Sequence, residues 1–180
     1  MAQTTTVRPQ PSKGPAASEL SELFIGIVGA VGTNLTLVID HLVQELRAAE
    51  YHPEVIRMSN LIARCAKYNY LTKLDDGPED DRINGYMNAG DDLRRTMRRG
   101  DAAALLAISK IQTVRIERTA NSNSIQKRAF ILNSLKHPDE VHTLRTIYGE
   151  AFFVVSADLP LNFHPVAIRG SAVDTPFGAG

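Results

Sequence analysis

The chain has 180 residues, of which 43% are hydrophobic and 22% charged, and this is enough apolar material for one globular domain with a sizeable core. Its 20 basic and 20 acidic residues balance, so the overall charge favours neither a nucleic acid nor an anionic membrane as a partner. The single Cys65 excludes an internal disulfide and a multi-cysteine zinc site, and no apolar run reaches the ~18–20 residues of a membrane span, so we expect a cytoplasmic protein without a membrane partner.

Composition divides the chain into three parts. Residues 1–20 are rich in Thr, Pro, Gln, Ser and Ala without periodicity, which predicts a disordered leader. Residues 21–157 carry all the periodic segments and form the predicted domain. Residues 158–180 lack periodicity, and we interpret them as an irregular tail that is a truncated linker to a further domain.

The most informative stretch is residues 23–34, where an apolar run ends in glycines spaced by three and a helical pattern follows. We predict a strand over 24–28, a tight turn, and a helix from Leu35 with Thr33 or Asn34 as its N-cap. A glycine turn at a helix N-terminus favours a bound phosphate. The predicted phosphate-binding residues are Gly26, Gly29, Ala30, Val31, Gly32, Thr33 and Asn34.

The same stretch fits the P-loop pattern G-x-x-x-x-G-K-[ST] poorly. Ile27 occupies the position where the pattern requires its first glycine, Thr33 the position of its lysine, and Asn34 the position of its Ser or Thr. Because Thr33 and Asn34 carry no charge, we expect binding to survive and phosphoryl transfer to be lost. A Rossmann site for NADP, in which Arg57 would contact the 2′-phosphate, is a weaker alternative. Ile27 also occupies the position of the first glycine in the G-x-G-x-x-G motif of that fold.

Strands alternate with helices along the rest of the domain. We predict strands over 54–58, 129–132 and 151–155, with a short helix after Met58 that Ser59 or Asn60 caps, an exposed acidic loop over 75–81, and a helical middle over 83–114 in which Asp101 caps the second helix. A last helix through residues 141–148 ends at Gly149. This order predicts a mostly parallel α/β sheet that binds its ligand at the carboxyl ends of the strands.

The helical middle carries the one strong charge asymmetry. Between Arg94 and Arg128 there are nine basic residues and two acidic ones, which indicates either a solvated helical face or a lid that folds over a polyphosphate. Nucleic acid is less favoured, since no aromatic residue in this stretch offers a base-stacking surface. The candidate phosphate or lid contacts are Arg57, Arg94, Arg95, Arg98, Lys127, Arg128, Lys136 and His137.

Four segments resemble the N-terminal half of anti-phage deoxycytidylate (dCTP or dCMP) deaminases, and the likeness covers residues 22–155. The segments lie at residues 23–33, 54–59, 101–108 and 134–149, the last of which contains Ser134-Leu135-Lys136-His137-Pro138-Asp139-Glu140-Val141. The resemblance implies a three-layer P-loop kinase-like fold with a degenerate phosphate loop. It also implies a nucleotide-binding, regulatory role in a bacterial antiviral defence protein that depletes deoxycytidine nucleotides.

The resemblance further implies the ligands and partners. An NTP or dNTP is the expected ligand, with Mg²⁺ as a candidate companion ion, and zinc is expected only in the deaminase domain. That domain is expected in cis or in trans, with a homo-oligomer as a further arrangement. Its P-C-x-x-C motif does not occur in this chain, so no catalytic residue is assigned. Two other functions stay open: an active small-molecule kinase, with Lys127 or Lys136 replacing the missing lysine, and an interaction module with an empty loop.

Overall fold

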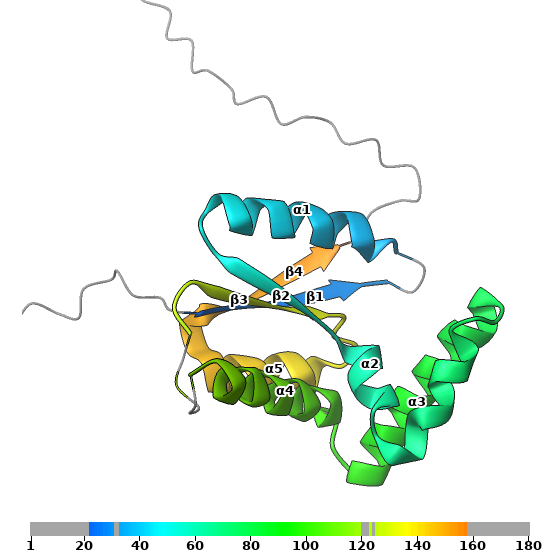
Figure 1. Cartoon of the computed structure of the whole chain (residues 1–180). Coiled ribbons are helices and arrows are strands. Elements are labelled where there is room, and N and C mark those ends of the chain that lie inside the picture. Colours follow the sequence, from blue (N-terminus) through cyan, green and yellow to red (C-terminus); the bar gives the residue numbers. More distant parts are fainter. Residues whose placement is uncertain (1–21, 31–32, 120–122, 124, 158–180) are drawn as a thin grey trace, which may run out of the picture.

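A computed structural model describes residues 22–30, 33–119, 123 and 125–157 (Figure 1). The predicted leader and tail, and also Val31 and Gly32, lie outside the described residues. The elements follow one another as β1 (Glu22–Gly29), α1 (Leu35–Ala48), β2 (His52–Arg57), α2 (Met58–Ala63), η1 (Ala66–Leu74), α3 (Glu79–Met97), α4 (Ala102–Thr119), β3 (Arg128–Asn133), α5 (Pro138–Tyr148), η2 (Gly149–Ala151) and β4 (Phe152–Ala157), η denoting a 3-10 helix.

The four strands form one parallel sheet in the order β2-β3-β1-β4. The strand register places Asn133 level with Ile27 on one side and with Arg57 on the other. Because all the strands run in the same direction, their carboxyl ends meet at one edge, where α/β folds bind their ligands. The predicted mostly parallel α/β sheet is therefore confirmed.

Helices cover both faces of the sheet, which gives three layers (Figure 1). On one face, Ile25, Ile27 and Ile131 pack against α1 through Ile39 and Leu46. The opposite face packs against α4 and α5, where Phe24 stacks on Tyr148 with ring centroids 3.7 Å apart. Neighbouring residues of a strand point to opposite faces, so the continuous apolar runs in β1 and β3 reflect a sheet that is buried on both sides.

An arm built from α2, η1 and α3 projects from the body (Figure 1). The arm has a small core of its own, formed by buried residues that include Ile62, Tyr68, Leu71, Ala89 and Leu93. Ala102 at the start of α4 belongs to the same cluster. The arm is therefore anchored where α4 enters the body, and it stands next to the carboxyl edge of the sheet. The architecture is consistent with a three-layer P-loop-like fold.

Several predicted boundaries are confirmed. The side chain of Asn34 caps α1 by accepting a hydrogen bond from the Thr36 amide at 3.1 Å. Gly149 ends α5 with φ = 57°, a left-handed value that glycine adopts without strain. None of the helices in the described part of the chain is both long enough and apolar enough to cross a bilayer.

Two predicted boundaries are wrong. The second strand ends at Arg57, which is also the N-cap residue of α2, so neither Ser59 nor Asn60 caps that helix. The acidic loop is shorter than predicted, because Glu79 and the two aspartates after it form the first turn of α3. Acidic side chains are stabilised at a helix N-terminus by its partial positive charge, and this explains why the acidic run begins a helix.

Candidate functional site

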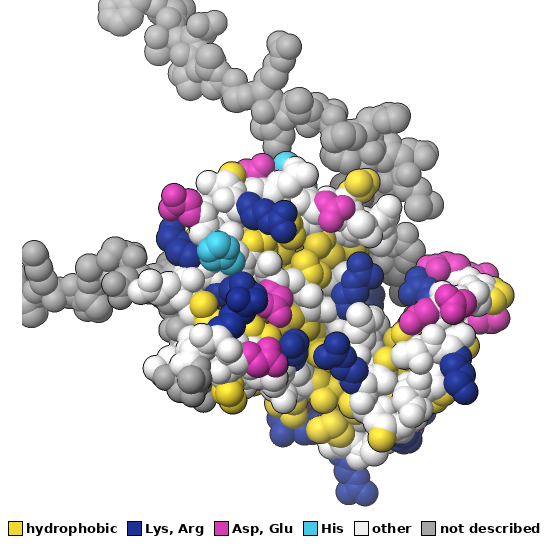
Figure 2. Space-filling model, viewed as in Figure 1, with side chains coloured by type: hydrophobic (Ala, Val, Ile, Leu, Met, Phe, Trp, Pro, Cys, Tyr) yellow, Lys and Arg dark blue, Asp and Glu magenta, His cyan; other side chains and the backbone are white. Residues whose placement is uncertain are grey.

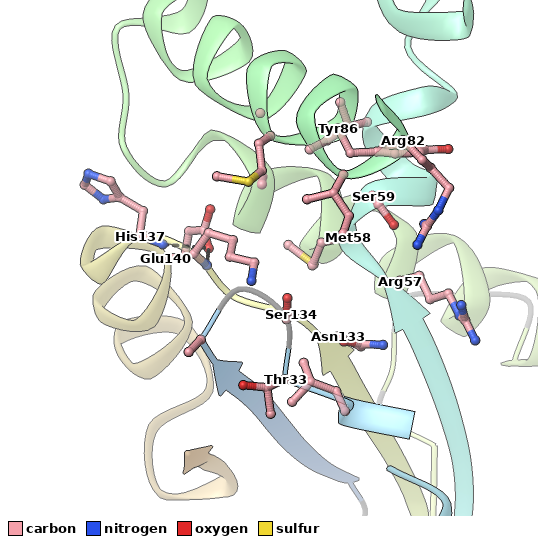
Figure 3. Close-up of a pocket in the computed structure, with 18 of the residues that line it drawn as sticks. Thr33, Arg57, Met58, Ser59, Arg82, Tyr86, Asn133, Ser134, His137 and Glu140 are labelled. Carbon is pink, nitrogen blue, oxygen red and sulfur yellow. Dashed lines mark hydrogen bonds between the residues drawn. The ribbon is translucent and has the colours of Figure 1, made fainter. Parts of the chain in front are cut away.

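A cleft of about 780 Å³ lies between the carboxyl edge of the sheet and the arm helix α3. Figure 2 shows the recess between the body and the arm, with Lys and Arg side chains on the body and acidic ones at the tip of the arm. Figure 3 shows the side chains that converge on the cleft from the ends of β2 and β3, from the turn before α1 and from α3. The cleft lies where a parallel sheet binds ligands.

The turn between β1 and α1 forms the floor of the cleft through Ala30, Thr33 and Asn34. The Thr33 amide donates a hydrogen bond to the Ala30 carbonyl at 3.1 Å. The first turn of α1 has no acidic residue to compensate its partial positive charge. This end of the cleft is therefore suited to an anion.

The first two glycines of the motif are explained by packing. Gly26 is buried inside β1, where an added Cβ would lie 2.6 Å from Leu135 Cδ1 and 3.1 Å from the ring of Phe152. At Gly29 an added Cβ would lie 2.7 Å from Leu35 Cδ2 and 3.3 Å from the Ala157 carbonyl oxygen. Gly26 does not line the cleft, so its position does not support the predicted phosphate contact.

Two basic side chains reach the cleft without an acidic partner. Arg57 is the last residue of β2, and Lys136 lies in the loop between β3 and α5. Lys136 Nζ lies 3.5 Å from the carbonyl oxygen of Gly29, which places its ammonium group beside the end of β1. Neither residue forms an ion pair with any described residue. Their charges are left for a ligand or for solvent.

A buried carboxylate fixes the loop that carries Lys136. Glu140 has an exposed fraction of only 1%, and its Oε2 accepts hydrogen bonds from the backbone amides of Lys136 at 2.7 Å and of His137 at 3.3 Å. Its Oε1 accepts a third hydrogen bond from Arg94 Nη2 at 3.3 Å. Arg94 also pairs with Asp91 at 2.9 Å, so it contributes to the cleft wall as a partly neutralised group.

His137 also borders the cleft, but its side chain has a structural role. Its Nδ1 accepts a hydrogen bond from the Asp139 amide at 3.2 Å and so caps α5. In Figure 3 the ring points outward, away from Asn133 and Thr33. Because Nδ1 already caps the helix, His137 is a weaker candidate for a phosphate contact than Lys136.

Four of the predicted basic contacts do not line the cleft. Arg95 is exposed on α3, and Arg98 ends that helix with a left-handed φ of 54°. Lys127 and Arg128 lie at the opposite, amino edge of the sheet, where Lys127 is over the ring of Tyr51 and Arg128 pairs with Glu54. A residue that begins β3 is separated from the cleft by the length of the strand. The structure therefore does not bring these four residues to the site.

Of the wall that α3 contributes to the cleft, only Arg94 is predicted from the sequence. The cleft-lining residues of α3 recur every three or four positions, which places them on one side of the helix: Glu79, Arg82, Ile83, Tyr86, Met87, Gly90, Asp91 and Arg94. Arg82 forms an ion pair with Glu79. Ile83, Tyr86 and Met87 on α3, together with Met58, give this end of the cleft a hydrophobic surface. The spacing of three and four residues along α3 is the sequence signal that could have indicated this wall.

Metal-binding groups are sparse in the described residues. No group of three or more His, Cys, Asp or Glu side chains within them could hold a metal ion.

In comparisons with known proteins, no protein-family model and no curated sequence matches this chain.

Proposed function

We propose that the domain binds a nucleotide in this cleft and acts as a regulatory, nucleotide-sensing unit. The observation that carries the proposal is the pair of uncompensated cations, Arg57 and Lys136, beside the turn that begins α1. A phosphate group beside Lys136 would also lie near the N-terminus of the helix, and Arg57 adds a second positive charge to the wall of the same cleft. Each of these contacts favours an anion, and charge-assisted hydrogen bonds are stronger than neutral ones.

The rest of the cleft supports a nucleotide over free phosphate. Its volume of about 780 Å³ exceeds that of a phosphate group and falls within the usual range of roughly 300–1,000 Å³ for ligand sites. Tyr86, Met87 and Ile83 on α3 offer an aromatic and aliphatic surface for a base or a sugar. Met87 has an exposed fraction of 47%, which a bound base would reduce. A phosphate end and an apolar end match the two chemical parts of a nucleotide.

The regulatory role rests on the missing catalytic lysine and on the family resemblance. Thr33 stands at the P-loop lysine position and Asn34 at the hydroxyl position, so the start of α1 lacks the charged catalytic group. We propose that nucleotide binding here controls a deoxycytidylate deaminase domain, in cis or in trans, in antiviral defence. A homo-oligomer would be one way to pass on the signal.

One contact favours a second function, an active kinase. Lys136 Nζ lies beside the carbonyl oxygen of Gly29, close to where a P-loop lysine would place its charge. Lys127, the other candidate replacement, lies at the far edge of the sheet. If the domain transfers a phosphoryl group, Lys136 is therefore the lysine that would stabilise it.

Binding assays with matched variants test the proposal. Calorimetric titration of dCMP, dCTP, ATP and NADPH into the wild-type protein should give binding to at least one of the cytidine nucleotides. We expect Arg57→Ala and Lys136→Ala each to weaken that binding by roughly 10- to 100-fold, the loss of one charge-assisted contact. Lys127→Ala is the control and should bind normally. Failure of all four ligands to bind would contradict the proposal and favour an interaction module.

A turnover assay separates the sensor from the kinase. Incubation of the wild-type protein with ATP and a nucleoside should give no phosphorylated product if the domain is a sensor. Turnover that Lys136→Ala abolishes and Lys127→Ala retains would instead establish the kinase.

A further inference from the structure

We propose that the cleft recognises the phosphate group of a nucleotide without a divalent metal ion, so that its preferred ligand is a metal-free nucleoside monophosphate. This inference rests on the proposed function and adds the chemical form of the ligand. The argument depends on which oxygen and nitrogen groups the chain places around the anion end of the cleft.

Apart from the buried Glu140, the side chains that line this end of the cleft are neutral or positive. Thr33, Asn34, Ser59 and Ser134 contribute hydroxyl and amide groups, and Asn133 ends the central strand β3. In P-loop NTPases an aspartate from a neighbouring strand helps to hold Mg²⁺ beside the phosphates. Asn133 lies level with Ile27 of β1, next to the strand that leads into the turn, so it is placed where such a carboxylate would act. Its amide has no charge to offer a metal ion.

The carboxylates that line the described part of the cleft already have basic partners. Glu79 pairs with Arg82, and Asp91 pairs with Arg94. Glu140 is buried and accepts hydrogen bonds from two backbone amides and from Arg94. Freeing Glu140 for a metal ion would leave those donors unpaired, which costs about 1–3 kcal/mol for each buried group. Each of the three would have to give up its present partners to coordinate Mg²⁺, and the cost is largest for the buried Glu140.

Charge complementarity leads to the same conclusion. Mg²⁺ in nucleotide sites is held by one or two carboxylates together with the phosphate oxygens. Here the ion would meet no free carboxylate among the described residues and would be repelled by Arg57 and Lys136. A phosphomonoester carries about −1.5 to −2 charges at neutral pH, which two cations balance without a metal ion. Mg²⁺ bound to a triphosphate would neutralise the charge that these side chains recognise.

A metal titration of the wild-type protein tests the inference. Calorimetry with dCMP, and with inorganic phosphate as the phosphate group alone, is carried out in EDTA and again in millimolar Mg²⁺. We expect equal dCMP affinity in the two buffers, no binding heat for Mg²⁺ alone, and weaker dCTP binding when Mg²⁺ is present. Loss of dCMP binding in EDTA would overturn the inference and leave the proposed function intact. Absence of binding by dCMP, dCTP, ATP and NADPH in both buffers would overturn the inference and the proposed function together.

A gain-of-charge variant gives an independent measurement. Asn133→Asp introduces a carboxylate at the end of β3, and we expect it to weaken dCMP binding in EDTA by roughly tenfold, with Mg²⁺ restoring the affinity. Asn60→Asp on α2, outside the cleft, is the matched control and should leave binding metal-independent. An Asn133→Asp variant whose affinity is unchanged in both buffers would contradict the placement of the phosphate beside Asn133. If that variant does not fold, the wild-type titration decides alone.

Discussion

Glu140 on α5 accepts a hydrogen bond from Arg94 on α3 at 3.3 Å, and this ion pair joins the arm to the loop that carries Lys136. The Glu140 side chain is almost completely buried, and Arg94 has a side-chain exposed fraction of 16%. Removing one partner of a buried pair leaves the other without compensation, and this usually costs more than the pair itself contributes. Here Asp91 remains as a second partner for Arg94 and limits the loss.

We therefore predict that Glu140→Gln lowers the free energy of unfolding by about 1–3 kcal/mol. The variant keeps the shape of the side chain but loses the charge, and one of its amide hydrogens would face the backbone donors of the loop. Chemical denaturation followed by circular dichroism measures the change. Glu150→Gln, an exposed residue in η2, is the control and should alter stability by less than about 0.5 kcal/mol. Equal effects in the two variants would contradict the coupling role of Glu140.

Gly26 provides a test of packing against ligand contact. An added methyl group would meet Leu135 and Phe152, both of which are buried, so the core must rearrange to admit it. We predict that Gly26→Ala costs about 1–3 kcal/mol in the free energy of unfolding. Gly77→Ala is the control, because its nearest neighbour would be an ordinary contact at 3.4 Å. Equal stability of the two variants, measured by urea denaturation, would show that the space around Gly26 is not limiting.

Arg98 stores backbone strain that a glycine would relieve. It ends α3 with φ = 54°, and its amide donates to the Arg94 and Arg95 carbonyls as the cap of the helix. Residues other than glycine are destabilised by roughly 1 kcal/mol in this left-handed conformation. We predict that Arg98→Gly raises the melting temperature by a few degrees, whereas Arg95→Gly inside the helix lowers it by a similar amount. A drop in both variants would argue against strain at Arg98.

The order of strands and helices could be predicted from sequence because it depends on local signals. Continuous apolar runs marked β1 and β3, and Asn34 before an amphipathic stripe marked the start of α1. Boundaries failed where one residue serves two elements. Arg57 both ends β2 and precedes α2, so its apolar neighbour Met58 was assigned to the strand although it begins the helix.

The site was less predictable because it depends on strand order, which sequence periodicity does not encode. Lys127 and Lys136 lie nine residues apart on either side of β3, and only the parallel sheet decides which of them reaches the cleft. Arg94 was selected from its charge and lines the cleft, but its partner Glu140 comes from α5, far along the chain. Such pairing between distant segments leaves no local pattern.

Asp101 illustrates a buried acid whose contacts make stability depend on pH. Its exposed fraction is 6%, and Arg99 donates to both of its carboxylate oxygens at 2.8 Å. Thr143 on α5 donates a third hydrogen bond at 2.7 Å, which ties the α3–α4 connection to the body. The Arg99 contacts, and then the Thr143 hydroxyl, hold the pKa of this carboxyl well below its usual range.

Because the pKa of Asp101 is lower in the folded than in the unfolded chain, the unfolded chain takes up a proton first as pH falls. The stabilisation by Asp101 is therefore complete above its unfolded pKa of about 4 and is lost progressively below that value. We predict that Asp101→Asn lowers the melting temperature by about 2–4 °C at pH 7 and that this difference shrinks below pH ~4. Asp76→Asn in the exposed loop before α3 is the control. Calorimetric melting from neutral to acidic pH measures both, and a wild-type minus Asp101→Asn difference that stays constant down to pH ~3 would contradict the prediction.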